Sequence, residues 1–412
     1  MNYETTKTLI VSCVLLVLFF LFCAFALLPQ PVRAQAVTTT VTGLNEPFDV
    51  ALTPNGNYAY VTNGGGSVSV INTASNKITA TISDRNGPFG VAVTPNGNYA
   101  YVTNGGSGSV SVISTVTNKV TKTIIVGNGP FGVAITPAGA YAYVTNFGSD
   151  SVSVISTASN TVVATVTVGS NPQSLAITPN GEYVYVSNFG AATVSVINTA
   201  TNTVTATVDV ESGPFGVAVT PNGDYVYIAN SGSGSVSVIS TATNTVTSRV
   251  PGLREPLGVA VIPNGAYACV ANDDSGTISV INTTTNKVTK TITVENAPYD
   301  VAVTPDGGYA YVTNLNSATV SVINVAPTLS ASPIPFLATS IPTPALTPTT
   351  TATAFVGVDG KDLSNSNLPF YQQHLVAIVL AIALAITVVI AVSVKLKDGA
   401  QSPERYWADC KN

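Results

Sequence analysis

The stretch Tyr101–Val120, YVTNGGSGSVSVISTVTNKV, recurs as near-copies through most of this 412-residue chain. Its YVTN element ends at seven asparagines, which are Asn63, Asn104, Asn146, Asn188, Asn230, Asn272 and Asn314. The first step is 41 residues and the other five are 42. A fixed period near 42 residues, built only from strand-like patterns, is typical of propeller blades with four strands each. The sequence therefore predicts an all-β fold, a seven-bladed β-propeller.

Each repeat contains four alternating apolar and polar segments that are separated by turn residues. In the second repeat these segments are Gly90–Pro95, Tyr99–Asn104, Ser109–Thr115 and Lys119–Val126. Valine and threonine dominate them, and branching at Cβ suits a pleated strand. The first two segments are joined by an Asn-Gly turn of the kind that closes hairpins. Four antiparallel strands per repeat are therefore expected.

The last repeat ends after its third strand, because Ala318–Val325 is followed by proline-rich chain. The missing strand is present at the other end, where Val37–Leu44 (VTTTVTGL) matches Lys287–Val294 (KVTKTITV). Closing a ring with strands from both chain ends removes exposed sheet edges. We therefore expect residues 37–326 to form a propeller that is closed by an N-terminal strand.

Residues 1–36 have the pattern of an N-terminal signal helix. Thr8–Leu28 is almost continuously apolar, Lys7 precedes it, and Ala34 and Ala36 form an A-x-A cleavage pattern. The apolar run is long for a signal peptide, so two interpretations stay open: a cleaved signal peptide and an uncleaved anchor.

A second apolar segment, residues 375–394, is predicted to be a transmembrane helix. At 1.5 Å per residue it would span about 30 Å, the thickness of a bilayer core. Lys395 and Lys397 follow it, as cytoplasmic flanks favour. Residues 327–374 are rich in proline, threonine and serine and predict an extended stalk or linker. The expected arrangement is single-pass, with an extracellular propeller and a cytoplasmic tail at residues 395–412.

The composition excludes several kinds of chemistry. His374 is the single histidine and lies at the predicted membrane boundary, which removes a Ser-His-Asp triad from the propeller. No CxxC or Cys/His metal spacing is present, and no basic cluster accompanies aromatic residues, so nucleic acid is not expected as a partner. No cofactor is expected, with calcium as the one weak candidate.

That candidate lies two residues after the proline that begins each repeat. The positions are Asp49, Gly90, Gly132, Ser174, Gly216, Gly258 and Asp300. The aspartates belong to the first and seventh blades, which become neighbours when the ring closes. Asp49 and Asp300 are therefore predicted as a ligand or cation site at the channel mouth, since oxygen ligands suit calcium. The alternative is that each carboxylate caps a backbone turn.

Three kinds of repeated side chain and one glycosylation sequon lead to further predictions. Phe48, Phe89, Phe131, Phe215 and Tyr299 precede the small position and are expected in the inter-blade core, with sugar stacking as the alternative. The tyrosines of the YVTN elements are expected to pack within strands. The asparagines of the same elements are expected to bond their own loop backbone. Asn282 begins the N-x-T glycosylation sequon Asn282-Thr-Thr.

The repeat PFGVAVTPNGNYAYVTN with SVSVISTVTNKV resembles the YVTN-type β-propeller repeat proteins, including archaeal surface-layer proteins. The resemblance covers about residues 37–326 and departs at YIAN, ending at Asn230, and CVAN, ending at Asn272. It implies an extracellular, non-catalytic propeller. The predicted function is thus a membrane-anchored surface module for adhesion or a surface layer, with envelope proteins or glycans as partners. The alternative is an exported lactonase-like hydrolase with its site in the central channel.

Overall fold

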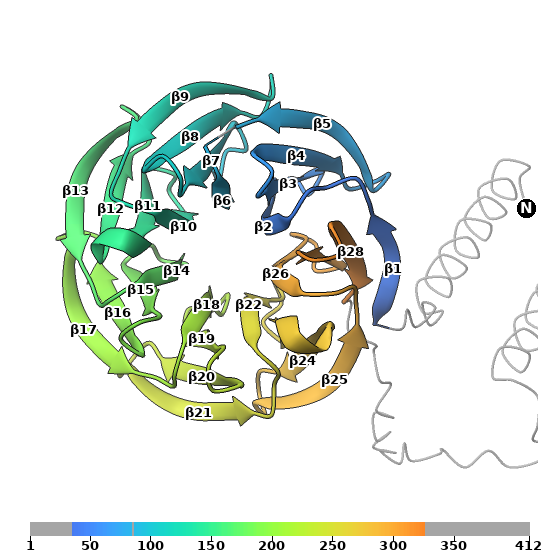
Figure 1. Cartoon of the computed structure of the whole chain (residues 1–412). Helices are drawn as coiled ribbons and strands as arrows, with labels where there is room; N and C mark the ends of the chain where they lie inside the picture. The colour runs from blue at the N-terminus through green and yellow to red at the C-terminus, as the bar shows by residue number, and fades with distance from the viewer. Residues whose placement is uncertain (1–34, 85, 326–412) are drawn as a thin grey trace, which may run out of the picture. The chain divides into compact units, whose positions relative to one another are not determined.

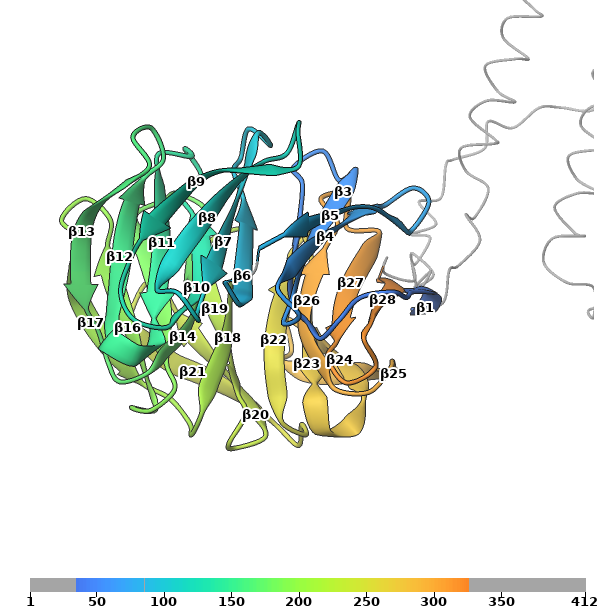
Figure 2. The ribbon, with the colours of Figure 1, turned by 45° about the horizontal axis from the view of Figure 1, so that its top comes forward.

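The computed structural model describes residues 35–84 and 86–325, which form seven four-stranded antiparallel sheets around a central axis (Figure 1). The first strand of each sheet lies nearest the axis and the fourth lies at the rim (Figure 1 and Figure 2). The prediction of an all-β, seven-bladed propeller is confirmed. The signal segment up to residue 34, the stalk, the transmembrane helix and the tail lie outside the described residues.

The sequence order of the strands matches the repeat. The first strands are β2 (Pro47–Leu52), β6 (Pro88–Val93), β10 (Pro130–Ile135), β14 (Pro172–Ile177), β18 (Pro214–Val219), β22 (Pro256–Val261) and β26 (Pro298–Val303). The second strands are β3 (Tyr58–Asn63), β7 (Tyr99–Asn104), β11 (Tyr141–Asn146), β15 (Tyr183–Asn188), β19 (Tyr225–Asn230), β23 (Tyr267–Asn272) and β27 (Tyr309–Asn314). The third strands are β4 (Ser67–Asn72), β8 (Ser109–Ser114), β12 (Ser151–Ser156), β16 (Thr193–Asn198), β20 (Ser235–Ser240), β24 (Thr277–Asn282) and β28 (Thr319–Asn324).

The fourth strands form the rim. They are β5 (Lys77–Ser83), β9 (Lys119–Ile125), β13 (Thr161–Thr167), β17 (Thr203–Asp209), β21 (Thr245–Pro251), β25 (Lys287–Thr293) and, in the seventh blade, β1 (Ala36–Val41). Two 3-10 helices, η1 (Phe147–Ser149) and η2 (Asp273–Ser275), lie in loops between second and third strands. Within the described ranges, no helix combines the length and the apolar character needed to cross a membrane.

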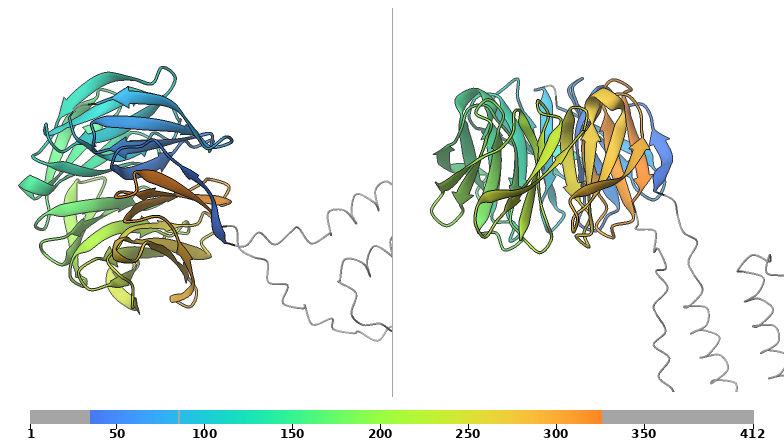
Figure 3. Two further views of the ribbon diagram at one scale, coloured as in Figure 1. Left: turned by 45° about the vertical axis from the view of Figure 1, so that its right-hand side comes forward. Right: turned by 90° about the horizontal axis from the view of Figure 1, so that it is seen from below.

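The ring closes as the sequence predicts. β1 pairs antiparallel with β28, from Ala36 opposite Asn324 to Val41 opposite Val320, with a bulge at Thr38. The N-terminal strand therefore lies beside strands that are almost 300 residues later in the chain (Figure 3). Val41 is buried and packs with core residues of the seventh and first blades. The two ends of the propeller thus complete one sheet and remove its free edge.

Apolar side chains pack between neighbouring blades. Tyr60 and Val70 of the first blade, for example, share a buried cluster with Val91 and Val102 of the second. Strand alternation produces this arrangement, because successive side chains point to opposite faces and each face meets a different neighbour. Each blade is therefore stabilised only when both of its neighbours are in place.

Buried tyrosines also join the blades through hydrogen bonds, which goes beyond the expected strand packing. The hydroxyl of each donates to a turn asparagine in the next blade at 2.5–2.8 Å; the pairs are Tyr60–Asn118, Tyr101–Asn160, Tyr143–Asn202, Tyr185–Asn244, Tyr227–Asn286 and Tyr311–Asn76. Each of these asparagines has a left-handed backbone, with φ of 52–54°. Asparagine tolerates that conformation better than most residues.

Cys269 replaces the tyrosine in the sixth blade, and the topology explains why. Its partner would be a turn between the third and fourth strands of the seventh blade, but the fourth strand there is β1 and no such turn exists. Cys269 is completely buried, and this burial raises the pKa of its thiol to about 12. The residue fills space and has no ionised sulfur at neutral pH.

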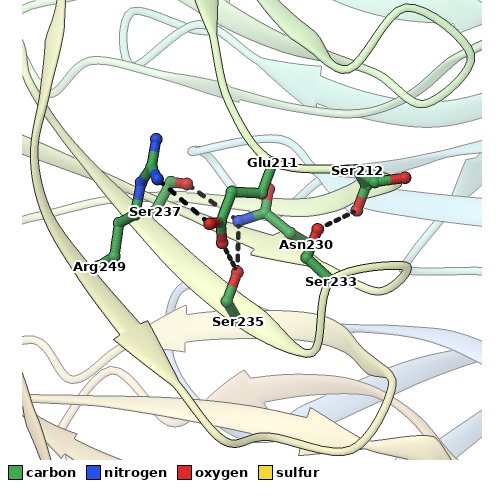
Figure 4. A network of polar contacts seen from close by, with 7 residues as sticks. All are labelled: Glu211, Ser212, Asn230, Ser233, Ser235, Ser237 and Arg249. Carbon is green, nitrogen blue, oxygen red and sulfur yellow. Dashed lines mark hydrogen bonds and ion pairs between the residues drawn. The ribbon is translucent and has the colours of Figure 1, made fainter.

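The last asparagine of each YVTN element follows the expected pattern only in part. Its amide nitrogen donates to hydroxyl groups on the third strand of its own blade. Asn230, for example, donates to Ser235 at 3.1 Å and Ser237 at 2.9 Å (Figure 4). Ser235 in turn donates to Glu211, which forms an ion pair with Arg249. The expected bond to backbone is present only in part, since Asn63 and Asn272 also donate to the carbonyls of Ser67 and Thr277, where their loops end. In every blade the main partners are hydroxyls at alternate positions of the third strand.

Hydroxyls of the YVTN elements form a second link between blades. In five blades the side chain donates to the carbonyl of the next first strand at 2.5–2.7 Å; the donors are Thr62, Thr103, Thr145, Ser187 and Thr313. Ala229 and Ala271 occupy this position in the fifth and sixth blades and have no hydroxyl. In the other five blades the same hydroxyl also accepts an N–H from the first strand of its own blade. Each alanine therefore removes two hydrogen bonds and leaves the fold intact.

Deleting Val37–Leu44 is expected to open the ring. The deletion removes most of the β1–β28 ladder and exposes the apolar face beneath it, a loss of several kcal/mol that corresponds to a fall of about 10 °C or more in the melting temperature. Scanning calorimetry of the full-length protein measures this. An eight-residue deletion at positions 341–348 serves as the control. Equal melting temperatures for both deletions would contradict the role of β1.

Tyr143→Phe is expected to cost about 1–2 kcal/mol of unfolding free energy, because Asn202 loses its hydrogen-bond donor in a buried environment. Tyr141→Phe is the matched control, since Tyr141 begins the same strand and is 41% exposed. Urea denaturation compares the two variants. Equal stabilities would show that the inter-blade bond contributes nothing.

Candidate active site

Ring closure brings Asp49 and Asp300 together, as the sequence predicts. Asp49 lies on β2 and Asp300 on β26, the first strands of the first and seventh blades. The backbone N–H of Val50 lies 2.7 Å from Oδ1 of Asp49 and 3.4 Å from Oδ2 of Asp300. A hydrogen bond also joins the two carboxyl groups. The pair is therefore formed by the first and seventh blades together, at the seam where the ring closes.

Backbone groups hold this pair in place. Oδ2 of Asp49 accepts a hydrogen bond of 2.8 Å from the N–H of Val91, on the first strand of the second blade. On the other side of the pair, Gly258 leaves room for Asp300. A Cβ on Gly258 would lie 2.6 Å from Oδ1 of Asp300, so glycine is required there. The carboxyl groups thus have fixed positions before any ligand arrives.

The pair retains a proton more strongly than free carboxyl groups do. Burial raises the pKa of Asp49 above 3.8, while hydrogen bonds from Asp300 and from the N–H groups of Val91 and Val50 counteract part of that shift. Burial raises the pKa of Asp300 well above 3.8, and the neighbouring charge and hydrogen bond of Asp49 raise it further. The two carboxyl groups therefore titrate together, and the pair holds a proton to higher pH than free carboxyl groups do.

Five aromatic side chains surround the axis next to this pair. Each ring contacts the next in a closed cycle, with centroids 4.8–5.8 Å apart; the members are Phe48, Phe89, Phe131, Phe215 and Tyr299. We call these five residues the aromatic collar. The expectation that they belong to the inter-blade core is wrong. They come from the start of the first strands, where seven strands converge, and the rings meet one another across the axis.

Glycines in the adjacent loops make space for the collar. A Cβ on Gly64 would lie 2.9 Å from the ring of Phe48, and one on Gly105 would lie 2.7 Å from the ring of Phe89. The loops after the second strands therefore lie directly against the rings. Tyr299 is the one collar residue with a hydroxyl. Burial raises its pKa far above 10, and the charges of Asp49 and Asp300 add to the shift, so this group stays protonated.

The collar and the acid pair line one small cavity of about 60 Å³. Its other walls are the small residues at the position equivalent to Asp49, which are Gly90, Gly132, Ser174, Gly216 and Gly258. Ser174 contributes a hydroxyl and is the only one of these five with a polar side chain. The sequence singled out the acid pair and the five aromatic residues, but it favoured the inter-blade core for the aromatic residues and did not indicate a role for the Tyr299 hydroxyl. The relevant signal was the aromatic residue that directly precedes the small position.

The other predicted sites lie elsewhere. Asn282 is half-buried at the end of β24, where its Oδ1 accepts hydrogen bonds from the N–H and the hydroxyl of Thr285. Its glycosylation remains a prediction. Within the described ranges, no group of three or more His, Cys, Asp or Glu side chains is arranged to hold a metal ion. Asp49 and Asp300 are the two carboxylates that line the cavity, and both accept backbone N–H groups, so calcium binding there remains a prediction.

Comparisons with known proteins give a partial family match and many solved structures with a similar fold. Residues 72–213 match the family model of lactonase, a 7-bladed beta-propeller, over about a third of the chain. A chain of hydrazine synthase from Kuenenia stuttgartiensis superimposes with a TM-score of 0.64 at 25% identity, covering 69% of this chain and 97% of that one. No curated protein matches the sequence.

The lactonase match corrects the prediction of a non-catalytic module. Its range runs from the first blade to the start of the fifth and includes Gly90, Gly132 and Ser174 of the cavity. It points to a hydrolase-like propeller. The prediction failed because it relied on the absence of histidine, whereas two carboxyl groups that share a proton can also supply an acid and a base.

Asp300→Asn is expected to stabilise the protein at pH 8 and to have little effect at pH 4. The folded-state pKa of Asp300 lies above its usual 3.8, so its contribution to stability is complete below about pH 4 and is lost as pH rises through the folded value. Asparagine cannot ionise and avoids this loss, which amounts to about 1.4 kcal/mol for each unit of raised pKa.

Urea denaturation at both pH values measures the difference. Asp209→Asn is the control, because Asp209 is exposed at the end of β17. A variant that is less stable than wild type at pH 8 would contradict the shared proton. If calcium stabilised the wild type but not this variant, that result would support the cation interpretation.

Proposed function

We propose that this protein is a hydrolase that opens a small, uncharged cyclic ester inside its central channel. The observation that carries the proposal is the pair Asp49 and Asp300, which shares a proton beneath the aromatic collar. The partial lactonase match supports a hydrolase-like propeller, although residues 72–213 include neither Asp49 nor Asp300. The proposal corresponds to the alternative given by the sequence analysis, a lactonase-like hydrolase with its site in the central channel.

The two carboxyl groups have complementary tasks in this reaction. The carboxylate of Asp49 takes a proton from a water molecule as its oxygen attacks the ester carbonyl carbon. The bond between that carbon and the ring oxygen then breaks, and the carboxylic acid of Asp300 gives its proton to the ring oxygen. The products are a carboxylic acid and a hydroxyl on one open chain. Proton transfer between Asp49 and Asp300 restores the starting state, so protons balance over the cycle.

The walls of the cavity define the class of substrate. Its apolar surface comes from the collar, and its ionisable lining groups are Asp49, Asp300 and Tyr299. Because this lining contains no cationic side chain, it does not favour an anionic substrate. The small volume of the cavity, about 60 Å³, limits the substrate to a small ring without bulky substituents. A neutral lactone with a five- or six-membered ring fits these conditions.

The cellular location is a second part of the proposal. The apolar segments at residues 8–28 and 375–394 support export and anchoring of the propeller at the cell surface. A substrate would then reach the channel from outside the cell. The proposed partners are components of the envelope in which the protein is anchored.

Asp49→Asn and Asp300→Asn are each expected to lower the rate of lactone hydrolysis by about 10²- to 10⁴-fold, which is the usual contribution of one general acid or base. A pH-stat assay with unsubstituted γ- and δ-lactones measures the acid released. The wild-type rate is expected to have a bell-shaped pH profile, because one carboxyl must be ionised and the other protonated.

The exposed Asp209→Asn serves as the control and is expected to keep the wild-type rate. Circular dichroism confirms that each variant is folded. The proposal is wrong if wild-type protein hydrolyses none of these lactones above the uncatalysed rate, or if both active-site variants keep full activity.

A further inference from the structure

A second hollow lies beside the cavity of the acid pair. The two share the rings of Phe89 and Phe131, and the second hollow adds Phe147 from η1 and Gln173 from β14. Its volume is about 290 Å³. Three aromatic rings and one amide therefore surround a space between the second, third and fourth blades.

Gln173 is the unusual residue in this hollow. It occupies the position of a collar residue, where five other blades carry an aromatic ring. Its side chain is only 7% exposed, and its Oε1 has no hydrogen-bond partner in the protein. Burying an unpaired amide oxygen is unfavourable, and a hydrogen-bond donor on a ligand would remove this cost. Six asparagines of the YVTN elements also have an unpaired buried Oδ1, but of these seven residues only Gln173 lines a hollow.

Hydrogen bonds hold the loop that carries Phe147 in position. The N–H of Phe147 donates to the carbonyl of Gly129 at 2.9 Å, and the side chain of Asn171 donates to the carbonyl of Phe147 at 3.3 Å. Asp150 accepts the N–H of Asn171 at 2.8 Å. The loop that carries Phe147 is thus fixed to the chain just before Gln173.

The backbone of Gln173 is fixed as well. Its carbonyl accepts the hydroxyl of Thr145 from the third blade at 2.7 Å. The amide and the rings therefore keep their relative positions without a ligand, which lowers the entropic cost of binding.

We propose that this hollow binds a neutral pyranose ring, such as one hexose unit of an uncharged glycan. Aromatic rings offer flat apolar surfaces to the C–H face of a sugar, while a hydroxyl can both accept from and donate to the amide of Gln173. The residues that line the hollow include no ionisable side chain, so a charged ligand finds no counter-charge. Small-molecule sites are usually lined by apolar and aromatic side chains, with a few polar groups that orient the ligand.

The sixth blade provides an internal comparison. Leu257 occupies the same position as Gln173 and is equally buried, at 7% exposure. It presents only an apolar side chain. The preceding blade has Ser231 where the hollow has Phe147. The sixth blade, which also has no aromatic ring at the collar position, therefore lacks both the amide and the additional ring.

The proposed sugar site does not depend on hydrolysis at the acid pair. Saturation-transfer NMR tests it with full-length protein and the methyl glycosides of glucose, galactose, mannose and N-acetylglucosamine. The detergent used for the predicted apolar segments should have no sugar headgroup, because such a headgroup would compete. We expect saturable binding of at least one glycoside, with signal transfer strongest on its ring C–H protons.

Gln173→Leu, which copies the residue of the sixth blade, is expected to weaken that binding at least tenfold. Phe147→Ala is also expected to weaken it. Leu257→Gln and Asp49→Asn are the controls and are expected to keep wild-type affinity. The Asp49 variant separates this proposal from the proposed hydrolase, since it loses hydrolysis while sugar binding remains.

Three outcomes would overturn the proposal. The first is that none of the four glycosides binds to the wild type. The second is equal affinity of the bound glycoside for wild type and Gln173→Leu. The third is equal binding of cyclohexanol and the glycoside, which would show that the hollow recognises apolar surface alone.

Discussion

The β1–β28 ladder is the interaction on which the rest of the structure depends. Each blade buries one face against each of its neighbours, so a ring with a gap would expose two apolar faces at once. The ladder from Ala36 to Val41 completes the seventh blade and keeps it in contact with the first. Nothing covalent joins these ends. Within the described part of the chain, Cys269 is a free thiol and no disulfide supports the seam.

The acid pair is a product of the same closure. Asp49 and Asp300 are 251 positions apart in the sequence, and they share the N–H of Val50 only because β2 and β26 become neighbours. The site therefore lies between the first and seventh blades, where the ring of the propeller closes. The other junctions have glycine or serine at the equivalent position, so one position in the repeat varies to produce a site while the surrounding strands keep the same geometry.

Much of this architecture could be predicted from the sequence, for physical reasons. The repeat period, the asparagine turns and the match between the first and last strands are all local patterns, and strand alternation translates them directly into blades. The pairing of Asp49 with Asp300 followed from blade order alone. The absence of a tyrosine at Cys269 could also have been derived, because the seventh blade has no turn to supply the asparagine that the tyrosine would bind.

The remaining features depend on distances across the axis, which alternation does not encode. A residue such as Phe131 has the same local pattern whether its ring packs between blades or meets Phe89 and Phe215. Only the convergence of seven first strands decides between these arrangements. The unpaired state of Gln173 is equally invisible in the sequence, since it results from the groups that surround the amide in three dimensions.

The seam also determines how the ring responds to mechanical load. Ala36 pairs with Asn324, so the chain leaves both partner strands at the same end of the ladder. A force that separates these two residues acts on one hydrogen-bonded pair at a time, as in unzipping, and does not load all pairs together as shear would. The propeller is therefore mechanically weakest at the point where its flanking segments are attached, although thermal unfolding must disrupt many blade contacts at once.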